Sequence, residues 1–278
     1  MSITKLYPIR FDNFKVPGEE MITKPNWQKY YPAEGALTNW ALRSVLIVTE
    51  HQKILIDAGF GNKQSEEFFK TFQLNGNFSL TRQLADINLS HSDITDVLLT
   101  HLHFDHCGGC LIKKNDEIIP AFPNASLWIS KLQWESAQHP VEKEADSLLP
   151  ENINPLPNHY PVNFIEEEGG YIPGLYFKLV HGHTAGQIVP VIHIQNKAFL
   201  FGADLFPSSA HLEPNVNMSY DIDAELATKE KEQILEECLI NKYTIIFQHS
   251  LYIECCTLKK QRNQIVPDKT FQLKNISY

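Results

Sequence analysis

The chain lacks the features that would place it in a membrane, outside the cell or in a disulfide-bonded class. No apolar run approaches the roughly 18 residues of a membrane span, so no span is expected. The N-terminus has no basic segment followed by the apolar core of a secretion signal. The five cysteines, an odd number, do not form a disulfide framework. A reduced, cytoplasmic location is the default expectation.

Basic residues are also scarce. The formal net charge is −9, and the longest basic cluster is the short run Lys259-Lys260-Gln261-Arg262. Proteins that bind nucleic acids normally present a basic face, so a polyanion is not the expected partner. A small-molecule substrate is expected instead, with no nucleic-acid and no membrane partner, and a homodimer is compatible with the sequence.

The length and composition are those of a globular protein. The 278 residues are 43% hydrophobic and 21% charged, enough for a sizeable core. We expect one domain over residues 1–278, with residues 1–35 as an N-terminal extension that packs on it. Residues 12–34 interleave prolines with Trp27, Tyr30 and Tyr31, which predicts an irregular segment.

The most informative stretch is His101-Leu102-His103-Phe104-Asp105-His106, which follows the apolar, strand-like run 96–100 and precedes Gly108-Gly109. Imidazole and carboxylate groups are the donors that zinc and similar divalent metals prefer. In an extended loop alternate side chains point the same way, so His101 and His103 can share one metal. Asp105 and His106 then reach toward a second point. Without a metal, burying these groups together would leave polar atoms without partners.

Four more strand-like runs each end at a residue that can bind or support a metal. Residues 53–56 lead to Asp57, residues 176–180 to His181-Gly182-His183, residues 197–202 to Asp204, and residues 244–247 to His249. Asp57, at a strand end beside two glycines, can be an ordinary turn residue. Helices are expected near 64–74, 79–88, 131–138 and 224–241, and a closing hairpin from 251–257 and 269–274.

These motifs, in this order, resemble those of the metallo-β-lactamase fold superfamily. The resemblance implies an α+β fold, a four-layer αββα sandwich with the metal site along one edge. It implies that His101, His103 and His183 hold a first metal. Asp105, His106 and His249 would then hold a second metal, Asp204 would bridge the two, and Asp57 would accept a hydrogen bond from a ligand imidazole.

The resemblance also implies a chemistry. Two divalent ions, zinc first with manganese and iron as alternatives, would bridge a water that loses its proton near neutral pH and attacks a carbonyl or phosphoryl centre. Asp105 would orient that water or move a proton. The layout is similar to the lactonase and methyl parathion hydrolase branch, which favours a small ester or lactone substrate. Some lactonases carry a tyrosine three residues after the bridging aspartate, where this chain has Pro207.

Other hypotheses about the function and about individual residues stay open. A mononuclear iron oxidoreductase resembling persulfide dioxygenases uses a similar donor set, and the ligands alone do not fix the metal. A nuclease of the same fold is disfavoured by the acidic balance. His211 either lines the cleft or lies on the surface, and residues 139–175 form a cleft wall or a plain excursion. Cys107 and Cys110 are more often an incidental pair than a functional one.

Overall fold

The computed structural model describes residues 2–274, 276 and 277, and two large β-sheets dominate it. The first sheet has the strand order β17-β1-β3-β4-β5-β8-β9, with β2 beside β3. Its strands β4, β5, β8 and β9 run parallel, and β1, β3 and β17 pair antiparallel. The bounds are Lys5–Pro17 (β1), Ala33–Glu34 (β2), Leu37–Val48 (β3), Lys53–Ile56 (β4), Asp96–Leu98 (β5), Ser126–Ser130 (β8), Val162–Ile165 (β9) and Ile276–Ser277 (β17).

The second sheet has the order β10-β11-β12-β13-β14-β15-β16. It is antiparallel except for the parallel pair β13 and β14. The bounds are Gly169–Ile172 (β10), Leu175–Val180 (β11), Gln187–Ile194 (β12), Lys197–Phe201 (β13), Thr244–Ile246 (β14), Cys255–Gln261 (β15) and Gln264–Phe271 (β16). A separate hairpin pairs Leu111–Lys114 (β6) with Glu117–Pro120 (β7).

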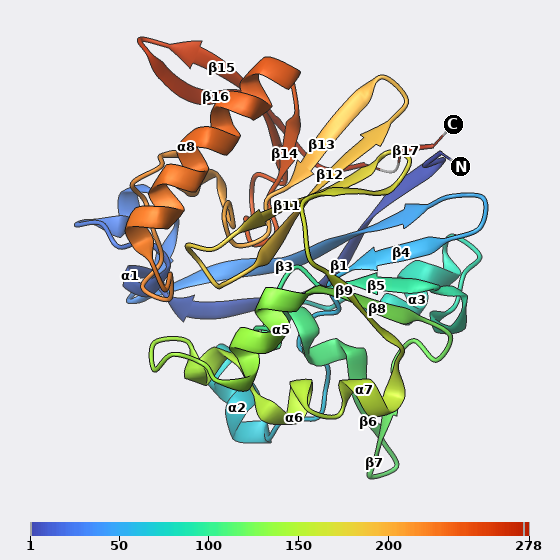
Figure 1. Cartoon of the computed structure of the whole chain (residues 1–278). Coiled ribbons are helices and arrows are strands. Elements are labelled where there is room, and N and C mark those ends of the chain that lie inside the picture. The colour runs from blue at the N-terminus through green and yellow to red at the C-terminus, as the bar shows by residue number, and fades with distance from the viewer. Residues whose placement is uncertain (1, 275, 278) are drawn as a thin grey trace.

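Helices cover the outer faces of both sheets (Figure 1). The α-helices are Gly18–Met21 (α1), Glu66–Phe72 (α2), Leu80–Ala85 (α3), Phe104–Cys107 (α4), Lys131–Gln138 (α5), Pro150–Ile153 (α6), Leu156–His159 (α7) and Ala224–Asn241 (α8). The 3-10 helices are Trp27–Lys29 (η1), His91–Asp93 (η2), Gly108–Cys110 (η3), Ala145–Ser147 (η4) and Ser209–Leu212 (η5).

Alternating side chains on the strands make the layers. On β4, Ile54 and Ile56 face the second sheet, where they meet Phe199 and Phe201 in a shared core. Leu55 between them packs on the other side. That outer core includes residues of α3, α6 and α7, while residues of α8 pack with the outer face of the second sheet. The result is the expected αββα sandwich, and burial of both sheet faces accounts for the mostly apolar strands.

The N-terminal segment differs from the expectation of an irregular stretch. Strand β1 continues to Pro17 and pairs with β3 from Lys5 onward, with a register shift between Arg10 and Asp12. The alternation of buried Leu6, Ile9, Phe14 and Val16 is interrupted at that shift, which hid the strand's length from a simple period-two pattern. Residues 1–35 therefore contribute a strand to the first sheet, and α1, η1 and β2 beside it.

Most elements expected from hydrophobic periodicity are present near their expected positions. Helices α5 and α8 span 131–138 and 224–241 as expected, and α2 and α3 are shorter than the predicted 64–74 and 79–88. Residues 139–175, which gave few local signals, contain η4, α6, α7, β9 and β10. Among the described residues, no helix is long and apolar enough to cross a membrane.

Candidate metal centre

Five strand ends bring the candidate ligands to one edge of the sandwich. Asp57 directly follows β4, His183 follows β11, and Asp204 follows β13. The His101–His106 stretch follows β5, and His249 follows β14. Because β4 and β5 are parallel, as are β13 and β14, the carboxyl ends of each pair lie on the same side. Sites in sheet proteins commonly form at such carboxyl ends.

The structure brings together every ligand expected from the motifs. Among the described residues, donor atoms gather in two groups, each with all atoms within 4.8 Å of one another. The first group is His101, His103, His183 and Asp204, and the second is Asp105, His106 and His249. All seven side chains are buried, as a preformed metal site requires.

Asp204 lies between the two groups. Its Oδ2 is 3.4 Å from His183 Nε2 and 4.0 Å from His101 Nε2, on the first side. Its Oδ1 is 2.9 Å from His249 Nε2 and 3.6 Å from His106 Nε2, on the second side. A carboxylate has two oxygens and an imidazole has one free lone pair, so Asp204 is the side chain suited to contact two cations.

Asp57 and Glu144 orient two of the histidines, each through the ring nitrogen that faces away from the centre. Asp57 Oδ2 is 3.0 Å from His106 Nδ1, which leaves Nε2 for the centre. Asp57 also accepts hydrogen bonds from the Thr100 backbone and the Gln248 amide, which hold the carboxylate in place. Glu144 Oε1 is 3.0 Å from His103 Nε2, so His103 presents its Nδ1 instead. Such partners set the tautomer and orientation of metal-binding imidazoles.

The other three histidines are oriented in the same way by different groups. Asp221 Oδ1 is 2.9 Å from His183 Nδ1, and Thr100 Oγ1 is 3.0 Å from His101 Nδ1. His249 Nδ1 lies 2.9 Å from the carbonyl oxygen of Ala41 on β3. A backbone carbonyl therefore orients the His249 ring. Glu144 and Asp221 were not predicted, because no local pattern marks them.

Close backbone packing shapes the His101–His106 stretch. It is not an extended loop throughout, because α4 begins at Phe104 and turns Asp105 and His106 toward the second group. A Cβ on Gly109 would lie 2.0 Å from the carbonyl oxygen of Ala58, and one on Gly108 would lie 2.3 Å from the Phe60 carbonyl oxygen. The glycine pair therefore allows the backbone after His106 to pack directly against the backbone that follows β4, in addition to permitting a turn.

Strained backbone occurs at two of the strand ends. Asp57 has φ 55°, and Ala203, just before Asp204, has φ 43°. Alanine rarely adopts left-handed backbone, which costs free energy that the surrounding structure must offset. The strained residue Ala203 directly precedes Asp204, the residue whose carboxylate lies between the two groups.

Burial and the neighbouring charges shift the pKa values of the buried groups at the candidate centre in both directions. Burial lowers the pKa of His101 well below its ordinary value, and the nearby His106 lowers it further. Burial would raise the pKa of Asp204, but His249 and the other imidazoles outweigh it and hold the pKa well below the usual range. Burial would lower the pKa of His106, yet Asp105 and Asp204 raise it well above its ordinary value. A proton and a metal therefore compete for the same nitrogen of His106.

Unpartnered nitrogen atoms show that the residues fit a metal. His101 Nε2 and His106 Nε2 are buried and have no hydrogen-bond partner among the residues that the structure describes. Buried polar atoms are almost always satisfied, and an exception requires an explanation. Both atoms belong to the two groups and face Asp204. Divalent ions at the two groups would satisfy them.

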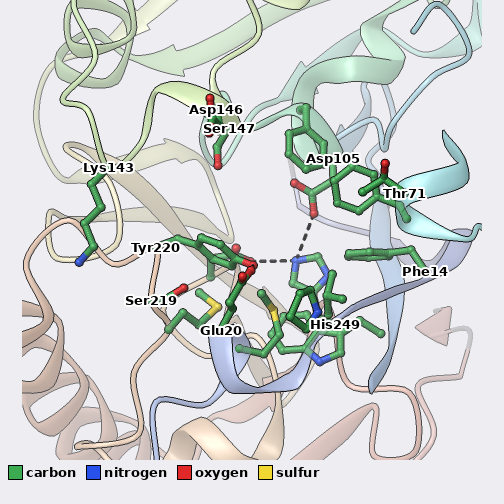
Figure 2. Close-up of a pocket in the computed structure, with 18 residues that line it drawn as sticks. Phe14, Glu20, Thr71, Asp105, Lys143, Asp146, Ser147, Ser219, Tyr220 and His249 are labelled. Carbon is green, nitrogen blue, oxygen red and sulfur yellow. Dashed lines mark hydrogen bonds and ion pairs between the residues drawn. The ribbon is translucent and has the colours of Figure 1, made fainter. Parts of the chain in front are cut away.

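A cleft of about 570 Å³ opens on the two groups, with Asp105, Asp204 and His249 in its lining (Figure 2). Phe14 and Phe104 contribute apolar surface to it. From the 139–175 stretch, Lys143, Asp146 and Ser147 line the same cleft. This stretch therefore forms part of the cleft wall, and Glu144 within it reaches His103.

Three residues singled out in the sequence lie outside the cleft lining. His211 is fully buried, with Nδ1 2.9 Å from Ser208 Oγ and Nε2 2.9 Å from the Met21 carbonyl oxygen. It is not part of the cleft lining, so the expectation that it contacts substrate is not met, because both ring nitrogens serve the fold. Cys107 and Cys110 are buried free thiols with raised pKa values caused by burial, so neither is a reactive thiolate.

Comparison with known proteins agrees with this architecture. The family model described as the metallo-beta-lactamase superfamily matches residues 40–249, the span that holds all the candidate ligands. The chain belongs to this superfamily. The match confirms the resemblance that the histidine motif suggested.

Relatives within the superfamily are lactonase-like. An N-acyl homoserine lactonase of Bacillus cereus is 25% identical over 228 residues, which cover 78% of this chain and 84% of that protein. A probable metal-dependent hydrolase from Staphylococcus aureus superposes with a TM-score of 0.85 at 24% identity, covering 98% of this chain and 100% of its own. A dizinc quorum-quenching lactonase has a TM-score of 0.79 at 21% identity, covering 98% and 97% of the two chains. The likeness confirms the fold and a superfamily hydrolase.

Proposed function

We propose that the protein is a dinuclear metal hydrolase, with zinc as the first choice of metal, that cleaves a small ester or lactone. The observation that carries the proposal is the position of Asp204, whose two oxygens face two separate histidine groups. A mononuclear site would need only the first group. The lactonase relatives support an ester or lactone as the substrate class.

His101, His103, His183 and Asp204 would hold the first ion, and Asp105, His106 and His249 would share Asp204 to hold the second. Two divalent ions supply polarisation of the substrate oxygen and a water of lowered pKa. Asp57, Glu144 and Asp221 accept hydrogen bonds from the imidazole nitrogens that face away from the centre, which fixes the ring orientation and leaves the other nitrogen of each ring facing the ion.

Asp105 has a further part in the proposal. Its Oδ2 is 3.8 Å from His249 Nε2, and its side chain reaches the cleft (Figure 2). There it can accept the proton that the attacking water releases and return it to the departing alcohol, so that the proton is conserved over the reaction. Phe14 and Phe104 line the same cleft as this carboxylate.

The test is bound metal measured by elemental analysis on protein purified without added metal, for wild type and Asp204→Ala. We expect about two zinc or manganese ions per chain in the wild type and fewer in the variant. A panel of lactones, esters and phosphotriesters then identifies the bond cleaved. A single tightly held iron with oxygen consumption would overturn the proposal in favour of an oxidoreductase, and failure to take up any metal would overturn both.

A further inference from the structure

The cleft lining has two carboxylates that neither metal group uses, Glu20 and Asp146. Glu20 of α1 lines the cleft with Tyr220 and Ser219. In Figure 2 these three lie on one side of the cleft and Phe14 and Thr71 lie on the other, with His249 between them. Glu20 is half-buried and faces the space that a substrate bound at the metal centre would occupy.

The short helix that carries Glu20 is held rigidly. The Ser219 N–H donates to the Glu20 carbonyl oxygen at 2.7 Å, and the Thr23 N–H donates to the Asn217 carbonyl oxygen at 3.0 Å. Gly18 lies so close to the Trp27 ring that a Cβ there would be 2.2 Å from it. The position of the carboxylate is therefore fixed before any ligand arrives, which lowers the entropy cost of binding.

The Glu20 side chain is also oriented. The Tyr220 hydroxyl donates to Glu20 Oε2 at 2.5 Å, and the pKa of Tyr220 is raised by burial and by Glu20, so the phenol stays protonated. A carboxylate offers about four acceptor sites, and this bond uses one of them. Glu20 can therefore accept hydrogen bonds from a ligand while Tyr220 holds it in place.

The opposite wall of the cleft is aromatic. Phe72 lies with its ring centre 5.0 Å from that of Phe104 and 6.4 Å from that of Phe14. These aromatic rings accept apolar groups, and the Thr71 hydroxyl on the same side donates to the Glu67 carbonyl oxygen. A ligand that spans the cleft therefore meets apolar surface on one side and a fixed negative charge on the other.

The cationic side chain in the lining does not neutralise Glu20. Lys143 Nζ donates to the Asp221 carbonyl oxygen, and in Figure 2 its ammonium group lies beyond Tyr220, away from His249. Asp146, on the same stretch of chain, adds a second carboxylate to the lining. Outside the metal groups, the charged side chains of the lining are therefore two carboxylates and this one lysine.

We propose that Glu20 is a specificity-determining residue, which selects carbonyl substrates that carry a protonated amine. The protonated amine would donate hydrogen bonds to the Glu20 carboxylate while the substrate carbonyl lies at the metal centre. The inference rests on the proposed function, because it assigns the substrate side of that cleft. It can nevertheless be tested by binding alone.

The test measures, by calorimetry on the zinc-loaded protein, the affinity of glycine, 4-aminobutyrate and 6-aminohexanoate. Each is compared with the fatty acid of equal length, propionate, pentanoate or heptanoate, in which a methyl group replaces the ammonium group. The carboxylate end is the same within each pair, so its contribution cancels. At one chain length we expect the amine to bind about tenfold more tightly, as a hydrogen bond to a charged group allows.

Glu20→Gln should reduce that ratio to about one, because the shape is kept and the charge is lost. Glu19→Gln is the matched control, since Glu19 is exposed on the same helix and is not among the cleft residues. It should keep the wild-type ratio. A ratio near one at all lengths in the wild type, or an unchanged ratio in Glu20→Gln, overturns the inference.

Phenyl esters of the same six acids separate this inference from the proposed function. If none is hydrolysed while the binding preference and its loss in Glu20→Gln are observed, the ester hydrolase proposal fails and the role of Glu20 in selection stands. If the esters are hydrolysed with no preference for the amines, the hydrolase proposal stands and the inference about Glu20 fails.

Discussion

Each histidine of the metal centre turns one ring nitrogen to the centre and uses the other for a fixed hydrogen bond. The five partners differ in kind: three carboxylates, one hydroxyl and one backbone carbonyl. The carboxylates raise the basicity of the imidazoles they contact. The consequences of removing a partner can therefore be predicted residue by residue.

Glu144→Gln should weaken metal binding without removing a ligand. Glu144 is buried and its Oε1 contacts both His103 and Thr184, so the loss of its charge leaves the His103 ring less basic and less fixed. Zinc affinity, measured by competition with a chelator, should fall about 10- to 100-fold. Glu142→Gln, at an exposed site, is the control. Equal affinities for the two variants would contradict this role.

The burial of His211 predicts that the folded protein loses stability as the pH falls. Burial lowers its pKa from 6.5 to about 3. The unfolded chain therefore binds a proton at this site in a pH range where the folded chain does not. The contribution of neutral His211 to the free energy of unfolding is complete above about pH 6.5. It is lost as the pH falls toward 3, by about 1.4 kcal/mol for each pH unit.

The measurement is the free energy of unfolding by denaturant between about pH 7 and pH 4, for wild type and His211→Gln. Groups common to both proteins cancel in the difference. The wild type should lose stability relative to the variant as the pH falls, because glutamine cannot take up the proton. Parallel curves would show that His211 does not titrate as its burial implies.

At the scale of elements, the strand ends explain what the sequence could predict. His101, His183, Asp204 and His249 each follow a short apolar strand, so a local pattern was enough to place them at one sheet edge. Glu144 comes from a stretch with mixed short elements, and its contact with His103 joins residues 41 positions apart. Such a contact depends on tertiary packing and leaves no periodic signal.

The N-terminal part of the chain also makes contacts that a local sequence pattern does not predict. Glu20 and Tyr220 are 200 positions apart, yet their side chains form a hydrogen bond on one side of the cleft. The prolines interleaved with aromatic residues in 12–34 led to the expectation of an irregular segment, whereas β1 continues to Pro17 past a register shift between Arg10 and Asp12. The residues that gather at the candidate metal centre were therefore predictable from local patterns, and the Glu20 side of the cleft was not.

Gly109→Ala tests the packing of the ligand stretch against the end of β4. A Cβ there would lie 2.0 Å from the Ala58 carbonyl oxygen, and backbone cannot yield as a flexible side chain can. We expect a loss of about 1–3 kcal/mol in the free energy of unfolding. Zinc affinity should fall as well, because Ala58 N–H donates to the His106 carbonyl oxygen in the same contact.

Gly170→Ala is the control for this substitution. Its Cβ would meet only the Tyr176 ring, at 3.3 Å, on the edge strand β10. Denaturant midpoints and zinc competition for the two variants are compared with wild type. If Gly109→Ala is as stable as Gly170→Ala, the backbone of residues 58–61 is free to move away, and close packing does not fix the ligand stretch.

At the scale of the whole molecule, the metal centre joins the two sheets. Asp57 and the His101–His106 stretch extend from the first sheet, and His183, Asp204 and His249 extend from the second. Without ions, the buried Nε2 atoms of His101 and His106 have no hydrogen-bond partner among the described residues. Ions that bind only the folded state therefore stabilise the contact between the sheets as well as the site.

Removal of metal should lower the melting temperature of the whole protein. Binding to the folded state alone adds about 2.7 kcal/mol when the free ion is at 100 times its dissociation constant. Zinc added to chelator-treated protein should raise the melting temperature, whereas magnesium, which prefers oxygen ligands, should not. In Asp204→Asn the rise should be much smaller, since one side chain with a single good acceptor oxygen cannot serve both groups. An equal rise in the variant would mean that Asp204 does not join the two groups, and that the sheets are held together by their shared apolar core alone.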